Sequence, residues 1–218
     1  MTNAVEARWH AALERLTERA THELKNPLNA LALNLEVLRA RLARGVDAAS
    51  VTRFADAAYF ELETLTERLE ALLALARPPR EPIDLHQMLK RLATLYGAAA
   101  AAEGGSLSVW SAPDVPLETK ADSHAVRLVL AAAVDMVTLP AGEAECGVRP
   151  GEQGDEIAVT VIRKGTTGDA RPAGENALRL SDGVKDAALD AGLRVVDGVD
   201  GVTIIFPRAD SGREELQT

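Results

Sequence analysis

The 218-residue chain has a single cysteine and few aromatic residues, which make up 3% of the total. The lone Cys146 excludes an internal disulfide, a pattern typical of proteins in a reducing compartment. With so few aromatic side chains, the core must be built from Leu, Val, Ile and Ala. The longest apolar run, residues 128–134, is far shorter than the roughly 20 residues of a membrane span. Since the N-terminus also lacks a signal-peptide pattern, we expect a cytoplasmic protein without a membrane segment.

Basic residues are in deficit as well. There are 24 Lys and Arg against 33 Asp and Glu, and the formal net charge is −9. Binding to nucleic acid requires a basic surface for the phosphates, so nucleic acid is not the expected partner. Hydrophobic residues account for 47% of the chain, which is typical of a globular protein and argues against disorder.

Two long segments carry apolar residues at helical spacing. In residues 4–43 the apolar positions recur every three or four residues, and in residues 50–76 they follow a strict heptad. Gly45 and Asp47 predict a short turn between them, so the two segments predict an antiparallel helical hairpin. Two helices alone cannot bury both apolar seams, so we expect a homodimer in which two hairpins form a four-helix bundle.

The remainder predicts a small α/β domain behind a proline-rich linker. We expect helices at 84–103, 122–138 and 176–191, and strands at 106–110, 145–149, 156–163, 193–196 and 202–206. The chain as a whole is therefore predicted to be α+β. Its expected parts are the hairpin at 1–77, the linker at 78–83, the α/β domain at 84–210 and a flexible tail at 211–218.

One side of the first predicted helix carries a group of polar residues. At about 100° per residue, His22, Lys25, Asn26 and Asn29 fall on the side opposite the apolar seam. An exposed imidazole on a rigid helix can act as a nucleophile at phosphorus, although a lone histidine is more often an ordinary surface residue. Pro27 lies in the same stretch and has no N–H for the carbonyl of Glu23, so we expect a kink or a loosened turn.

The string Thr-His-Glu-Leu-Lys-Asn-Pro-Leu-Asn-Ala-Leu, residues 21–31, closely resembles the phosphoacceptor box of sensor histidine kinases. The resemblance extends over both helices and the linker. It implies that His22 is the phosphorylated residue and that Glu23 matches the acidic general-base position. It also implies that Asn26 matches the position that supports phosphatase chemistry in that family.

The order of elements after the linker resembles the ATP-binding α/β sandwich of the same family, but the nucleotide motifs differ. The helix that begins after Asp122 contains no asparagine, whereas the family uses asparagines there to hold magnesium and phosphate. Arg163 stands where the family has an adenine-binding aspartate, and a guanidinium has donors only. Gly168 and Gly174 are too far apart for a phosphate loop. Two alternatives stay open for Arg163, Lys164 and Arg171, namely an anion site or ordinary surface charge.

An intact phosphoacceptor box with a degenerate ATP domain resembles dimeric histidine phosphotransferases of the ChpT type. The resemblance implies a phosphorelay protein that passes a phosphoryl group between receiver-domain aspartates through His22, with no cofactor of its own and with magnesium supplied by the receiver. The alternatives are an active histidine kinase with a divergent nucleotide site and a pseudokinase adaptor that binds response regulators. Lys25, Asn29, Leu33 and Val37 are the expected partner contacts, although the last two could instead pack on a neighbouring helix.

Three further residues have simpler interpretations. Cys146 lies in a predicted strand and is expected to be a small core residue. His86 and His124 each lie in the first turn of a predicted helix, and we expect surface or capping roles for them.

Overall fold

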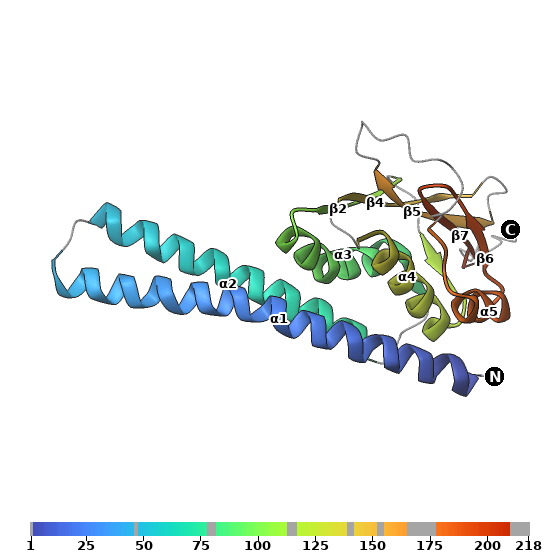
Figure 1. The fold of residues 1–218 in the computed structure, drawn as a ribbon, viewed down its shortest axis with the longest axis horizontal. Coiled ribbons are helices and arrows are strands. Elements are labelled where there is room, and N and C mark those ends of the chain that lie inside the picture. Colours follow the sequence, from blue (N-terminus) through green and yellow to red (C-terminus); the bar gives the residue numbers. More distant parts are fainter. Residues whose placement is uncertain are drawn as a thin grey trace, which may run out of the picture.

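The computed structural model describes residues 2–45, 48–77, 82–112, 117–138, 142–151, 155–164 and 178–209. Two long helices, α1 (Thr2–Ala43) and α2 (Ala48–Ala76), run antiparallel side by side and project away from an α/β unit (Figure 1). The predicted helical hairpin is therefore confirmed, with each helix starting two residues earlier than its apolar pattern suggested. Within the described residues, no helix is both long enough and apolar enough to cross a membrane.

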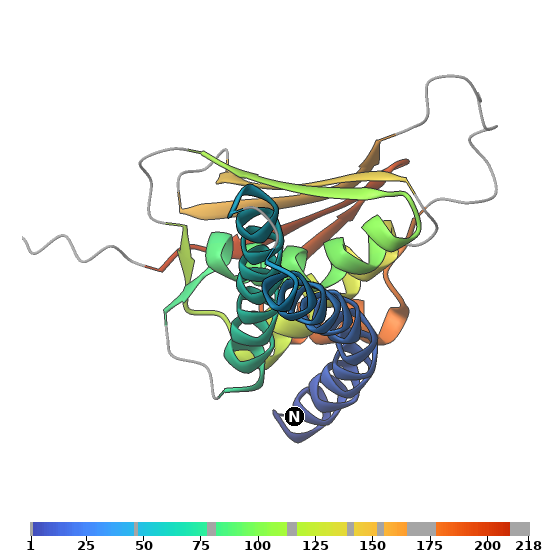
Figure 2. The same cartoon turned by 90° about the vertical axis from the view of Figure 1, so that its left-hand side faces the viewer.

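The second half of the chain is a sandwich of helices on a sheet. One layer is a five-stranded sheet of order β2-β4-β5-β7-β6, in which β2 and β4 are parallel and the other neighbours antiparallel. Three helices cover one face of this sheet (Figure 2). The helices are α3 (Leu85–Ala102), α4 (Ser123–Thr138) and α5 (Asp182–Asp190). The strands are β2 (Ser106–Ser111), β4 (Glu143–Pro150), β5 (Glu156–Lys164), β6 (Arg194–Asp197) and β7 (Gly201–Pro207).

Two predicted helix starts are confirmed by side-chain caps. The carboxylate of Asp84 accepts a hydrogen bond of 2.9 Å from the backbone N–H of Gln87. The carboxylate of Asp122 accepts one of 2.9 Å from the N–H of Ala125. Each bond satisfies an amide that has no partner inside the first helical turn, which is why an aspartate favours a helix start at that position.

The start of the last helix was predicted wrongly. We expected a helix from residue 176, but Leu178–Ser181 is not helical and α5 begins at Asp182. Ser181 is the N-cap residue of α5, with ψ at 150°, and Leu180 is buried in the core, so the segment before α5 forms a non-helical strap packed on the core. The prediction also missed β1 (Ile83–Asp84) and β3 (Glu118–Thr119), which pair only with each other.

Several predicted features lie outside the described residues. These are most of the predicted linker (78–81), all but the first residue of a Gly- and Pro-containing loop expected at 164–175, and the predicted tail at 211–218.

The base of the hairpin shares one hydrophobic core with the α/β unit. Trp9, Leu16 and Ala20 of α1 and Leu75 of α2 belong to the same buried cluster as α3 and α4. The half of α1 before residue 21 and the end of α2 are therefore held against the second domain, whereas the remainder of the hairpin extends beyond it (Figure 1).

A buried arginine reinforces this junction. Arg127 of α4 donates hydrogen bonds of 2.9 Å and 2.8 Å to the carbonyls of Leu75 and Arg77, where α2 ends. Its guanidinium also lies 5.8 Å from the ring centre of Trp9. The residue four positions after Leu75 is Pro79, which has no N–H, so the Leu75 carbonyl needs a donor from outside its own helix.

Candidate functional site

The polar residues near the middle of α1 share one solvent-facing surface. His22, Lys25, Asn26 and Asn29 are exposed, whereas Glu23 is half-buried and Pro27 is buried toward α2. Since the apolar seam turns these four side chains outward, an approaching partner can reach the imidazole without any change in the hairpin. The predicted exposure of the His22 surface agrees with these values, but the predicted seam is buried only in part, since Leu28 and Leu35 are about half exposed.

The turn after His22 is held by a contact from the other helix. Pro27 lacks the N–H that would bond the Glu23 carbonyl, yet α1 continues as one helix from residue 2 to residue 43. Nη1 of Arg68, on α2, lies 2.7 Å from that carbonyl oxygen and donates a hydrogen bond to it. The carbonyl freed by the proline therefore faces α2 and is occupied, and it does not open toward the His22 surface.

Sequence reasoning did not single out Arg68. The proline did indicate a carbonyl in need of a donor, but the donor comes from a residue 45 positions away. That pairing depends on how the two helices lie against each other, which the local sequence does not specify.

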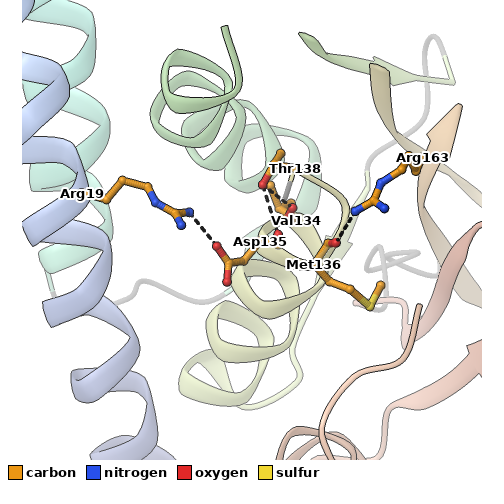
Figure 3. Close-up of polar contacts among 6 residues, drawn as sticks. All are labelled: Arg19, Val134, Asp135, Met136, Thr138 and Arg163. Atoms are coloured by element: carbon orange, nitrogen blue, oxygen red, sulfur yellow. Dashed lines mark hydrogen bonds and ion pairs between the residues drawn. The ribbon is translucent and has the colours of Figure 1, made fainter. Parts of the chain in front are cut away.

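An ion pair ties α1 to α4 one turn before His22. Nη1 of Arg19 lies 2.6 Å from Oδ1 of Asp135 (Figure 3). The Arg19 guanidinium also lies 5.5 Å from the ring centre of Tyr96. Burial raises the pKa of Tyr96 above its ordinary value, and the nearby Asp135 carboxylate adds to the increase, so the phenol stays neutral. Asp135 is the one carboxylate on α4, and it pairs with Arg19.

A cavity of about 330 Å³ lies between α1, α4 and the strap before α5. Arg15, Arg19 and Arg179 line it together with apolar side chains of α4, and none of its described lining residues is an asparagine or glutamine. Among the residues that the structure describes, no group of three or more His, Cys, Asp or Glu side chains could hold a metal ion.

Arg163 is engaged in a structural contact. Its Nη2 donates a hydrogen bond of 3.0 Å to the carbonyl of Met136 at the C-terminal end of α4 (Figure 3). Its Nε donates one of 3.2 Å to the neighbouring carbonyl of Val137. A cation there also complements the negative end of the helix dipole. Lys164 pairs with Glu145 at 2.5 Å. Both cations therefore contact groups of the protein itself, which favours ordinary surface charge over an anion site. Arg171, with Gly168 and Gly174, lies outside the described residues.

The two predicted apolar contacts differ in exposure. Leu33 is 61% exposed, whereas Val37 is half-buried. Leu33 follows His22 by 11 positions, which is about three helical turns, so both side chains lie on the same side of α1.

The other candidates behave as structural residues. Cys146 is fully buried, and this burial raises the pKa of its thiol to about 12, which makes it inert, as predicted for a core residue. His86 and His124 are half-buried, and the Nδ1 atom of each is buried with no hydrogen-bond partner among the described residues.

Comparison with known proteins assigns the hairpin to a class. Residues 12–81 match the family model of the His Kinase A (phospho-acceptor) domain. This part of the chain is therefore similar to the phosphoacceptor domains of histidine kinases. Among curated proteins, no significant match is found.

Solved structures similar to the chain are histidine kinases. The catalytic domain of histidine kinase ThkA has 15% identity and a TM-score of 0.45, over 60% of this chain and 97% of that one. A blue-light activated histidine kinase of Erythrobacter litoralis has 20% identity and a TM-score of 0.42, over 82% and 62%. Histidine kinase ThkA in complex with response regulator protein TrrA has 14% identity and a TM-score of 0.42, over 95% and 65%.

Proposed function

We propose that this chain is a histidine phosphotransferase that relays a phosphoryl group between receiver-domain aspartates through His22, without binding ATP. One observation carries the proposal: an exposed histidine in a phosphoacceptor domain is joined to a second domain whose candidate nucleotide residues serve other contacts. Asp135 is paired with Arg19, and Arg163 is bonded to the end of α4.

The proposed chemistry is two successive phosphoryl transfers. A ring nitrogen of His22 attacks the phosphorus of an aspartyl phosphate; the P–O bond to the receiver breaks and an N–P bond forms. Attack by the aspartate of a second receiver reverses these changes and frees the imidazole. Such transfers depend mainly on in-line positioning and charge neutralisation. Glu23 holds or deprotonates the ring, Asn26 orients a water or a phosphoryl oxygen, and the receiver supplies magnesium.

A receiver would dock along the His22 side of the hairpin. Lys25 and Asn29 flank the imidazole, and Leu33 offers an exposed apolar contact three turns further along α1. Phe60 of α2 is 65% exposed, and the contact between Arg68 and Glu23 sets the helix register so that Phe60 lies near the level of Leu33. The half-buried Val37 borders this surface on the side of α2.

We also propose that the protein is a homodimer. A second apolar strip, on the hairpin, provides the contact surface between the two copies. Leu28 and Leu35 on α1, and Leu62 and Leu69 on α2, are each about half exposed and recur at seven-residue spacing. Leu33 is about 200° from Leu35 around its helix, so the strip leaves the His22 side open. Two such strips pressed together form the core of a four-helix bundle.

The proposal is tested by comparing two phosphoryl donors. The purified protein is incubated with labelled ATP and magnesium alone, and separately with a panel of phosphorylated receiver domains. We expect acid-labile label from receivers only, and none in His22→Ala. Label taken directly from ATP would instead establish an active kinase, and docking of receivers without any transfer would establish an adaptor.

Two conservative variants test the roles of the neighbours. Glu23→Gln should slow phosphoryl transfer to His22 because it removes the charge that orients or deprotonates the ring. Asn26→Ala should slow hydrolysis of the phosphohistidine more than transfer. Lys25→Gln tests docking separately, because Lys25 flanks the imidazole on the proposed docking surface; we expect weaker receiver binding with an unchanged maximal rate.

A further inference from the structure

The inference starts from the carbonyl that Pro27 leaves without a donor. In a regular helix the N–H of residue 27 would bond the carbonyl of Glu23, and proline has no N–H. Pro27 is buried and Glu23 is half-buried, so water cannot readily replace the missing donor. Without another partner, the peptide group between Glu23 and Leu24 would be free to tilt.

Arg68 supplies that partner from the second helix. The Nη1–O distance to the Glu23 carbonyl is 2.7 Å, which is in the range of a short, charge-assisted hydrogen bond. The guanidinium is a planar, permanently charged donor on a half-buried side chain. The contact therefore attaches the peptide group between Glu23 and Leu24 to α2 and fixes the orientation of the turn that begins there.

We propose that Arg68 is a positioning residue for His22, which replaces the helical hydrogen bond lost at Pro27. This proposal rests on the proposed phosphotransfer through His22. The residues on this turn are the ones that the transfer uses, since Glu23 is adjacent to His22 and Asn26 lies one turn beyond it. Arg68 is held between the helices, so it acts through the orientation of α1 and not through contact with a receiver.

The effect of removing Arg68 should appear in the rate and not in docking. Arg68→Met keeps the aliphatic stem and removes the donor. We expect the maximal rate of transfer from a phosphorylated receiver to His22 to fall about tenfold, with an unchanged half-saturating receiver concentration. Arg53→Met is the matched control, because Arg53 lies exposed on the same helix and its one described contact is with the Phe54 ring.

A second substitution separates positioning from general stabilisation of the hairpin. Pro27→Ala restores a backbone N–H that can bond the Glu23 carbonyl, and this makes the Arg68 donor redundant. In the Pro27→Ala background, Arg68→Met should therefore change the transfer rate by less than about twofold. An arginine that only stabilised the hairpin would give the same loss in both backgrounds.

Each outcome decides the proposal. A wild-type protein that accepts no phosphoryl group from any receiver overturns the proposed function together with this inference. A wild-type protein that accepts it, with Arg68→Met at full rate, overturns only the role of Arg68. Equal losses of transfer rate from Arg68→Met in the wild-type and Pro27→Ala backgrounds also overturn only the role of Arg68. A loss that Pro27→Ala relieves supports the assignment, with folding of every variant verified by circular dichroism.

Discussion

Replacing Arg127 by methionine tests how the hairpin is attached to the second domain. Met keeps much of the apolar stem against Trp9 but removes the donors to the carbonyls of Leu75 and Arg77. The Leu75 carbonyl is buried, and Pro79 cannot bond it, so it would be left without a partner. A buried acceptor without a partner costs about 1–3 kcal/mol.

Two effects set the net magnitude. Arg77 is an exposed residue, so its carbonyl can bond water instead. Loss of the hydrogen bond from Arg127 to this carbonyl should therefore cost about 0.5–1 kcal/mol. In the opposite direction, the substitution relieves the desolvation that lowers the pKa of Arg127 from its ordinary value. We therefore expect Arg127→Met to reduce the free energy of unfolding by about 2 kcal/mol. For a chain of this size, that corresponds to a melting temperature lower by about 4–8 °C.

The assay is urea unfolding followed by two probes. Far-ultraviolet circular dichroism reports mainly the hairpin, and in a Trp110→Phe background the fluorescence of Trp9 reports the junction. Because Trp9 shares a core with α3 and α4, both probes should give one coincident transition. Arg149→Met, at an exposed position, should stay within about 0.5 kcal/mol of wild type. An Arg127→Met variant as stable as Arg149→Met would refute the reasoning.

Three further predictions concern the dimer, the thiol and the sheet. Leu35→Glu combined with Leu69→Glu places charges in the proposed dimer contact and should convert a dimer to a monomer, as measured by light scattering. Val199→Glu is the control and should leave the dimer intact, because Val199 is exposed in the turn between β6 and β7. Cys146 should react with a thiol reagent only after unfolding, since burial raises its pKa to about 12, and rapid reaction in native buffer would contradict this. Gly201→Ala should lower the free energy of unfolding, measured in urea, by about 3 kcal/mol, because the added Cβ would lie 2.0 Å from a carbonyl oxygen of β5. An unfolding midpoint equal to that of the wild type would show that β5 and β7 can move apart to admit the methyl group.

The hairpin and the helix starts were predictable because their signals are local. Apolar spacing of three and four residues defined α1 and α2 to within two residues, and Asp84 and Asp122 marked the starts of two further helices. The start of α5 was not, because the segment before it packs on the core through the buried Leu180 without being helical, and the local sequence does not mark where the helix begins.

The contacts that define the site could be predicted only in part. The exposure of His22 followed from the position of the apolar seam around the helix, and Pro27 indicated a carbonyl without a donor. The donors themselves, Arg68 and Arg127, lie 45 and 52 residues from the carbonyls of Glu23 and Leu75 that they bond. Such pairings depend on the packing of whole helices, and no short segment of the sequence encodes them.

The single continuous α1 acts as a cantilever with a fixed and a free end. The half of α1 before residue 21 is fixed in the second domain, where Trp9, Leu16 and Ala20 are buried, and the hairpin beyond it is unsupported by that domain. The deflection of a beam grows steeply with distance from its support, and His22 lies just two residues beyond Ala20. Bending should therefore displace the tip near Gly45 most and His22 least. When a partner binds the outer part of the hairpin, the imidazole of His22 should therefore keep a nearly constant position relative to the second domain.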